Sequence, residues 1–196
     1  MRQREVRAVY TDTTVTVYQA YPAEIASPAL LAGRFEPPFK RERMTWIKPS
    51  FLWMMYRCGW ATKPCQERVL AVEIRRDGFE WALGHASLSH FDPDRHASRA
   101  EWSRELKSSP VRVQWDPERS LRLAELPYRS LQVGLGAEAV SRYVDGWIVG
   151  LTEVTGPARE IRARLDAGDE AGAAALLPDE RVMPLSPEVA ARVGVA

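Results

Sequence analysis

The chain has 196 residues, of which 45% are hydrophobic and 27% are charged. This length suits one domain with a small appendage, and the apolar content is sufficient for a buried core. No apolar run reaches the roughly 18 to 20 residues that a membrane span requires, and the first residues, MRQREVRAVYTD, lack the apolar stretch of a signal peptide. We therefore expect a cytoplasmic protein with no membrane partner, in which Cys58 and Cys65 are reduced thiols.

β-Branched residues that alternate with polar ones predict two strands near the start of the chain, at Val6–Tyr10 and Thr14–Tyr18, joined as a hairpin. The composition of Ala23–Gly33 is typical of a helix, although Pro28 is expected to bend or break it. Apolar or alternating runs bounded by turn residues predict four further strands, at Met44–Lys48, Val69–Ile74, Val111–Trp115 and Ser130–Leu135.

Two helices carry the strongest local signals. Pro49 ends the strand before it, Ser50 can cap the apolar run that follows, and Gly59 suits a C-terminal cap, so a helix is predicted over 50–58. A second helix is predicted over 137–151, because its apolar residues recur on one helical face. Those residues are Val140, Tyr143, Val144, Trp147, Ile148 and Leu151.

These elements predict an α+β fold, in which helices pack on a mixed and mostly antiparallel sheet. Residues 1–155 are expected to form the single domain. From residue 156 onward, aromatic residues give way to alanine and charged residues, which predicts a helical C-terminal appendage over 156–196.

Positive charge is concentrated between residues 39 and 68, where three tryptophans also lie. Seven cations stand against two acids in this segment, whereas the whole chain has a net charge of only +1. Cations beside aromatic rings suit a ligand that carries phosphate and offers a ring for stacking, such as a nucleotide or a nucleic acid. The alternative is a buried apolar helix whose ends carry solvated charges. The cations are Lys40, Arg41, Arg43, Lys48, Arg57, Lys63 and Arg68.

Several islands of sequence, in order along the chain, resemble one family. They are VYQAY (17–21), RMTWIKPSFLWMMYRCGWATK (43–63), SPVRVQWDPER (109–119), YRSLQVGL (128–135) and YVDGWI (143–148). The family is known as domain of unknown function 4291, and the resemblance runs from about residue 6 to residue 155. The C-terminal appendage is expected to lie outside it.

The layout also resembles the ADP-ribosyltransferase fold. In that fold an early strand contacts NAD, a middle strand with hydroxyl residues runs into a helix, and a late strand carries an acidic residue. The resemblance implies catalytic roles for Lys48, Arg129 and Gln132, and an NAD site without a metal. It implies that NAD is bound by Tyr18, Gln19, Arg43, Thr45, Trp46 and Ser50.

Gln132 is a departure from that fold, because glutamine stands where the fold usually has glutamate. A glutamine can hydrogen-bond a ribose hydroxyl, but it carries no charge to stabilise a cationic transition state. Another acid must serve, or the protein binds its ligand without catalysis. Arg43, Lys48 and Arg129 are expected to converge on one polar cleft walled by Trp46 or Tyr18.

Three functions remain open on this reasoning. The first is an NAD-using transferase that modifies a nucleic acid or a protein. The second is a non-catalytic RNA or DNA binder that uses the basic segment from Lys40 to Arg68 as a phosphate track. The third is an interaction domain with no small ligand. The histidines of the loop His90–His96 show no recognised metal-binding spacing, so no metal is expected.

Overall fold

Strands and helices alternate along the chain, and the computed structural model describes residues 4–195. The expected α+β class is confirmed, with mixed and mostly antiparallel strand pairing. The strands are β1 (Arg7–Ala8), β2 (Thr14–Tyr21), β3 (Thr45–Ile47), β4 (Arg68–Arg75), β5 (Ala86–Leu88), β6 (Val111–Arg119), β7 (Glu125–Leu135), β8 (Ile148–Glu153) and β9 (Arg181–Val182).

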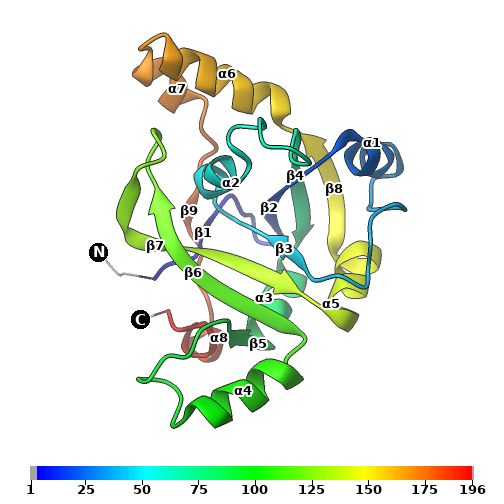
Figure 1. Ribbon diagram of the computed structural model, residues 1–196, viewed down its shortest axis with the longest axis vertical. Coiled ribbons are helices and arrows are strands. Elements are labelled where there is room, and N and C mark those ends of the chain that lie inside the picture. The colour runs from blue at the N-terminus through cyan, green and yellow to red at the C-terminus, as the bar shows by residue number, and fades with distance from the viewer. Residues whose placement is uncertain (1–3, 196) are drawn as a thin grey trace.

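The helices cover the sheets and the two ends of the molecule. They are α1 (Ala23–Ala32), α2 (Phe51–Cys58), α3 (Arg76–Gly84), α4 (Arg99–Ser108), α5 (Ala137–Arg142), the π-helical turn η1 (Tyr143–Trp147), α6 (Thr155–Asp166), α7 (Glu170–Ala175) and α8 (Pro187–Val193). Helices α6 and α7 lie at one end of the molecule, and α4 and α8 lie at the other (Figure 1). Within residues 4–195, no helix combines the length and apolar character needed to cross a membrane.

The strands form two main sheets rather than the single sheet that the sequence predicts. One has the order β2-β4-β8 and is antiparallel, and the other has the order β3-β7-β6-β5, with a parallel pair at β5 and β6. The sheets meet where the backbones of Tyr18 and Lys48 form an isolated bridge. The Tyr18 N–H donates to the Lys48 carbonyl at 2.7 Å. This junction brings the predicted early and middle strands together.

Helix α2 forms as the local sequence predicts. The Ser50 hydroxyl accepts a hydrogen bond from the Trp53 N–H at 3.1 Å and caps the helix. Gly59 ends it in the left-handed conformation, with φ of 60°. The residues on its inner face, including Met54 and Met55, are fully buried, so the helix is fixed against the sheet junction by hydrophobic burial.

The helix predicted over 137–151 is wrong in its last four residues, 148–151. Helix α5 gives way to η1, and residues from Ile148 onward form β8, which pairs with β4. Val140, Val144 and Trp147 are buried as expected, whereas Ile148 is half-buried in a strand. The ring of Trp147 lies directly over Gly78, where an added Cβ would come within 2.5 Å of it. Long-range strand pairing therefore overrides the helical period after residue 147.

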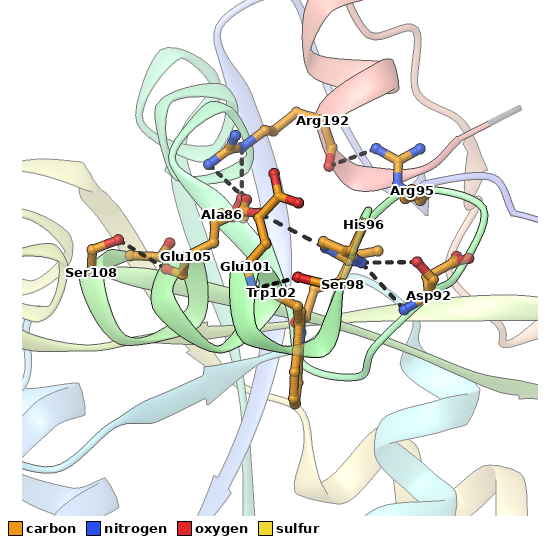
Figure 2. Close-up of polar contacts among 12 residues, drawn as sticks. Ala86, Asp92, Arg95, His96, Ser98, Glu101, Trp102, Glu105, Ser108 and Arg192 are labelled. Atoms are coloured by element: carbon orange, nitrogen blue, oxygen red, sulfur yellow. Dashed lines mark hydrogen bonds and ion pairs between the residues drawn. The ribbon is translucent and has the colours of Figure 1, made fainter.

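Residues after 155 return to the first part of the chain at two places. Strand β9 pairs with β1, and Met183 is 2% exposed in the main core. Helix α8 is attached through Arg192, whose Nε donates to the Ala86 carbonyl at 2.8 Å and whose guanidinium pairs with Glu105 at 3.2 Å (Figure 2). The division of the chain at residue 155 stays a prediction.

Candidate functional site

An open pocket lies beside the junction of the two sheets and has a volume of about 480 Å³. Small-molecule sites commonly have volumes of roughly 300 to 1,000 Å³. The pocket walls come from β2, the start of α1, the loop before β3, β3 itself, and α2 with the loop that follows it. The lining residues are Gln19, Ala20, Tyr21, Pro22, Ile25, Pro38, Phe39, Lys40, Arg43, Met44, Thr45, Trp46, Lys48, Met54, Arg57, Cys65 and Gln66.

Four cations line this pocket, and no aspartate or glutamate does so among residues 4–195. The cations are Lys40, Arg43, Lys48 and Arg57. Across the described part of the chain, none of the four has a carboxylate oxygen within 4 Å. Like charges gathered without a counter-charge repel one another, so the arrangement favours an anionic ligand.

The other three cations of the basic segment are engaged elsewhere. Arg41 forms a bidentate pair with Asp145, at 2.6 and 2.9 Å. Arg68 pairs with Glu153. Lys63 donates to the backbone carbonyls of Tyr56 and Arg57 at the end of α2. Of the seven cations, the four that line the pocket have no carboxylate partner in the described part of the chain, whereas the other three are held by a carboxylate or by backbone carbonyls outside it.

Lys48 is the innermost of the four pocket cations. Its side chain is 6% exposed, and its Nζ donates to the carbonyl of Trp46 at 3.2 Å. The Nζ also lies 5.7 Å from the centre of the Trp53 ring. Burial, with a smaller contribution from the positive charge of Arg57, lowers the pKa of Lys48 from 10.5 to about 7. Lys40, Arg43 and Arg57 are exposed, so three charges surround the rim while one amine lies inside.

The negative charge of Asp116 raises the pKa of Lys48, against the effects of burial and Arg57. Its two carboxylate oxygens already accept hydrogen bonds from the side-chain amides of Gln114, at 2.8 Å, and Gln132, at 2.7 Å. Because these amides are neutral, they hold the carboxylate in place without neutralising it. Asp116 thus offsets part of the burial cost of Lys48 without forming an ion pair with it.

A network of neutral hydrogen bonds forms the polar floor of the pocket. The Gln19 amide donates to Thr45 Oγ1 and to the Tyr21 hydroxyl, both at 2.8 Å, and its Oε1 accepts from the Tyr143 hydroxyl at 2.6 Å. Burial raises the pKa of Tyr21 to about 12, so its hydroxyl stays protonated at neutral pH. Since each of these groups is satisfied within the protein, the network is a rigid base for the site.

Trp46 supplies an aromatic wall on β3. The neighbouring residue across the sheet is Gly134, where an added Cβ would come within about 3.0 Å of the Trp46 ring and 2.8 Å of the Met44 sulfur. A glycine here lets the indole lie close against the backbone of β7. Trp46 is half-buried, and the ring is therefore held by the sheet while part of it remains accessible from the pocket.

The structure brings together five of the residues predicted for the site. Gln19, Arg43, Thr45, Trp46 and Lys48 all line the pocket. The two cations that sequence reasoning did not place there are Lys40 and Arg57. Both belong to the basic segment, but their position depends on how the loop before β3 and the end of α2 fold back onto β2.

Four other predicted residues do not line the pocket. Tyr18 stacks edge-on against Phe51, at 5.4 Å between ring centres. Ser50 caps α2, and Gln132 is bound to Asp116. Arg129 lies opposite Pro117 on the outer part of β7, and its backbone bridges to Arg4. The expected cluster of Arg43, Lys48 and Arg129 is therefore replaced by one that contains Arg57 and Lys40.

A second group of ionisable residues surrounds the start of α2. The Ser50 hydroxyl donates to Glu118 at 3.0 Å, and the Phe51 N–H donates to Glu180 at 2.6 Å. Burial raises the pKa of Glu118, and burial together with the negative charge of Glu118 raises the pKa of Glu180 to about 8. These groups stabilise the helix start, and the described pockets do not reach them.

The three histidines lie in separate surroundings. His85 stacks on Trp81, with 4.1 Å between ring centres. The ring of His96 is buried, with Nδ1 near the backbone of Asp92 and Nε2 3.8 Å from Glu105 (Figure 2). In the described part of the chain, no group of three or more histidine, cysteine or acidic side chains is arranged to hold a metal ion.

Comparison with known families identifies one family that matches most of the chain. The model of the family described as "Domain of unknown function (DUF4291)" matches residues 5–183. The chain belongs to this family. The match extends past residue 155 and through β9, so the expectation that the resemblance ends before the C-terminal segment is wrong. No curated protein matches the chain.

Proposed function

We propose that the protein binds a nucleotide in the pocket beside the sheet junction. The observation that carries this proposal is the group of four cations in a pocket that has no lining carboxylate among the described residues. Phosphate oxygens supply the missing negative charge, and arginine binds them through paired N–H groups. Trp46 offers a face for stacking a base or a nicotinamide ring.

NAD is the nucleotide that we propose to test first. Its pyrophosphate suits the exposed rim cations Arg43 and Arg57, and its two rings suit an aromatic wall. The resemblance to the ADP-ribosyltransferase fold supports this choice only through β2 and β3, which correspond to its early and middle strands and line the pocket. Because Gln132 is bound to Asp116 outside the pocket, it has no role in our proposal, which is confined to binding.

Nucleic-acid binding is the alternative, and the ion pairs of the basic segment weigh against it. A phosphate track requires a continuous row of free cations, whereas Arg41, Lys63 and Arg68 are engaged within the protein. The form of this alternative that the ion pairs leave open is a single-stranded RNA that enters only the pocket. A nucleotide and an RNA are distinguished by the steepness with which the affinity of the protein for each falls as the salt concentration rises.

Thermal unfolding with NAD, ADP, inorganic pyrophosphate and a short RNA tests the proposal. A ligand that binds the pocket is expected to stabilise the protein by about 2.7 kcal/mol at 100 times its dissociation constant. Replacing Arg43 or Arg57 by alanine should weaken nucleotide binding about 10- to 100-fold, as expected for loss of a charge-assisted hydrogen bond. Arg41→Ala is the matched control, because Arg41 lies in the same segment but pairs with Asp145.

The reactivity of the two cysteines provides an independent measurement of ligand binding in the pocket. Cys65 is exposed and lines the pocket, whereas Cys58 is buried in α2. A bound nucleotide should slow the reaction of Cys65 with a thiol reagent, while Cys58 stays unreactive in the folded protein with or without ligand. If no nucleotide stabilises the protein or protects Cys65, or if Arg41→Ala weakens binding as much as Arg57→Ala, the proposal is refuted.

A further inference from the structure

Lys48 occupies a buried position in the pocket that anion binding alone does not require. The exposed rim cations Lys40, Arg43 and Arg57 already present positive charge to a phosphate. A fourth cation in the interior adds repulsion, and its burial carries a desolvation cost. This cost is unusual for a lysine without an ion-pair partner, because charged side chains are rarely buried unless they are paired.

The surroundings of Lys48 favour the neutral amine. Its Nζ has one hydrogen-bond partner among the described residues, the Trp46 carbonyl, whereas an ammonium group offers three donors. Burial disfavours the charged form of Lys48 most, and the positive charge of Arg57 on α2 disfavours it too. Asp116 on β6 and Cys58 on α2 offset these effects only in part, so the pKa of Lys48 is lowered to about 7. About half of the molecules then hold a neutral amine at neutral pH, against fewer than about one in a thousand for an ordinary exposed lysine.

A neutral lysine inside a pocket that is surrounded by cations is a nucleophile. Lysines activated by desolvation and by a neighbouring cation attack carbonyl carbons. We propose that Lys48 forms an imine with an aldehyde or ketone that carries a phosphate, with Lys40, Arg43 and Arg57 binding the phosphate. This inference rests on the anion-binding part of the proposed function and adds a covalent step to it.

The step balances without any further reactant. The lone pair of Nζ attacks the carbonyl carbon, and one N–H proton moves to the oxygen to give a carbinolamine. The new hydroxyl then leaves as water with the second N–H proton, and an imine remains. A nucleotide that ends in a reducing sugar and a simple sugar phosphate share this chemistry, since both present a carbonyl and a phosphate to the pocket.

Labelling with pyridoxal 5′-phosphate followed by borohydride reduction tests the proposal. Reduction converts an imine into a stable secondary amine, which peptide mass spectrometry assigns to one lysine. The chain has four lysines, and the other three, Lys40, Lys63 and Lys107, are exposed. Lys48 is expected to be labelled at least about tenfold faster than these at neutral pH, because its neutral fraction is larger.

Pyridoxal without the phosphate is the matched control probe. It offers the same aldehyde but lacks the phosphate. Because charge-assisted hydrogen bonds to a phosphate strengthen binding about tenfold or more, pyridoxal should label Lys48 at least about tenfold more slowly than pyridoxal 5′-phosphate does. Inorganic pyrophosphate should compete with the phosphorylated probe. Arg57→Ala should lower labelling by the phosphorylated probe more than labelling by pyridoxal. The wild-type measurement is sufficient by itself, so a variant that fails to fold does not prevent the test.

The outcomes separate this inference from the proposed function. If nucleotides stabilise the protein but Lys48 is labelled no faster than Lys63, the imine proposal is overturned and nucleotide binding stands. If both probes label Lys48 equally and pyrophosphate does not compete, the phosphate-bearing class of ligand is overturned. Preferential labelling of Lys48 that depends on the phosphate supports the inference, whichever nucleotide the pocket prefers.

Discussion

Replacing Lys48 by methionine is expected to make the stability of the protein less dependent on pH. Methionine has a similar length and carries no charge. It therefore removes the desolvation cost of a buried ammonium group while it fills most of the volume of the lysine side chain. The matched measurement is the free energy of unfolding of wild type and variant across a range of pH. All other titrating groups, including Glu180, are present in both proteins and cancel in the difference.

The magnitude follows from the pKa of Lys48. Burial and Arg57 lower this pKa from 10.5 to about 7. At about 1.36 kcal/mol per pH unit, a protonated Lys48 therefore destabilises the folded protein by about 5 kcal/mol relative to the unfolded chain. Between these two pKa values the unfolded chain binds a proton that the folded protein does not, so stability rises with pH. The cost is fully present below about pH 7, and it disappears as pH rises through the unfolded pKa.

Urea unfolding at about pH 6 and about pH 9 measures the effect. The advantage of Lys48→Met over wild type should shrink by about 2 to 3 kcal/mol between these conditions, as the cost in wild type declines. Packing changes caused by the substitution shift both values equally and leave this difference intact. A difference that stays constant within about 0.5 kcal/mol would show that Lys48 titrates as an ordinary exposed lysine, and the basis for its nucleophilic role would be lost.

Three further substitutions test the framework of the site. Tyr143→Phe removes the donor to Gln19 Oε1 and should cost about 1 to 3 kcal/mol of stability, measured by chemical denaturation; a loss near zero would contradict the role of the network. Trp147→Ala empties a buried position and should cost about 3 to 5 kcal/mol; a loss under about 1 kcal/mol would show that the ring is not packed. Glu180→Gln keeps an acceptor for the Phe51 N–H and should gain stability over wild type as pH rises from about 4.5 to about 8, because the folded state holds this carboxyl protonated in that range. A parallel pH dependence in the two proteins would refute the assigned pKa.

Sequence patterns were most informative where a structure depends on near neighbours. The Ser50 cap, the apolar run of α2 and Gly59 lie within ten residues, and the helix forms as they predict. The alternating runs that predict strands are present as β2, β4, β6 and β7. In the same way, the excess of cations between residues 39 and 68 was visible in composition alone.

Tertiary structure decided which of those cations remain available to a ligand. Arg41 is neutralised by Asp145, 104 residues away, and Arg68 is neutralised by Glu153, 85 residues away. Pairing at such separations has no local pattern, because it depends on where the folded sheets place each side chain. The burial of Lys48 likewise results from the bridge between β2 and β3, and its pKa follows from that burial.

The region around residues 137–151 shows the same division. Its apolar period predicts one continuous helix, and residues 137–147 follow that prediction as α5 and η1. From Ile148 onward the backbone instead pairs with β4, because hydrogen bonds to an adjacent strand and burial against the core outweigh the small local preference for a helix. The sequence by itself determined the elements with strong local signals, such as α2 and β4, and the charge of the basic segment. Long-range pairing determined β8 and the pocket, since hydrogen bonds and ion pairs across the fold depend on distance in space.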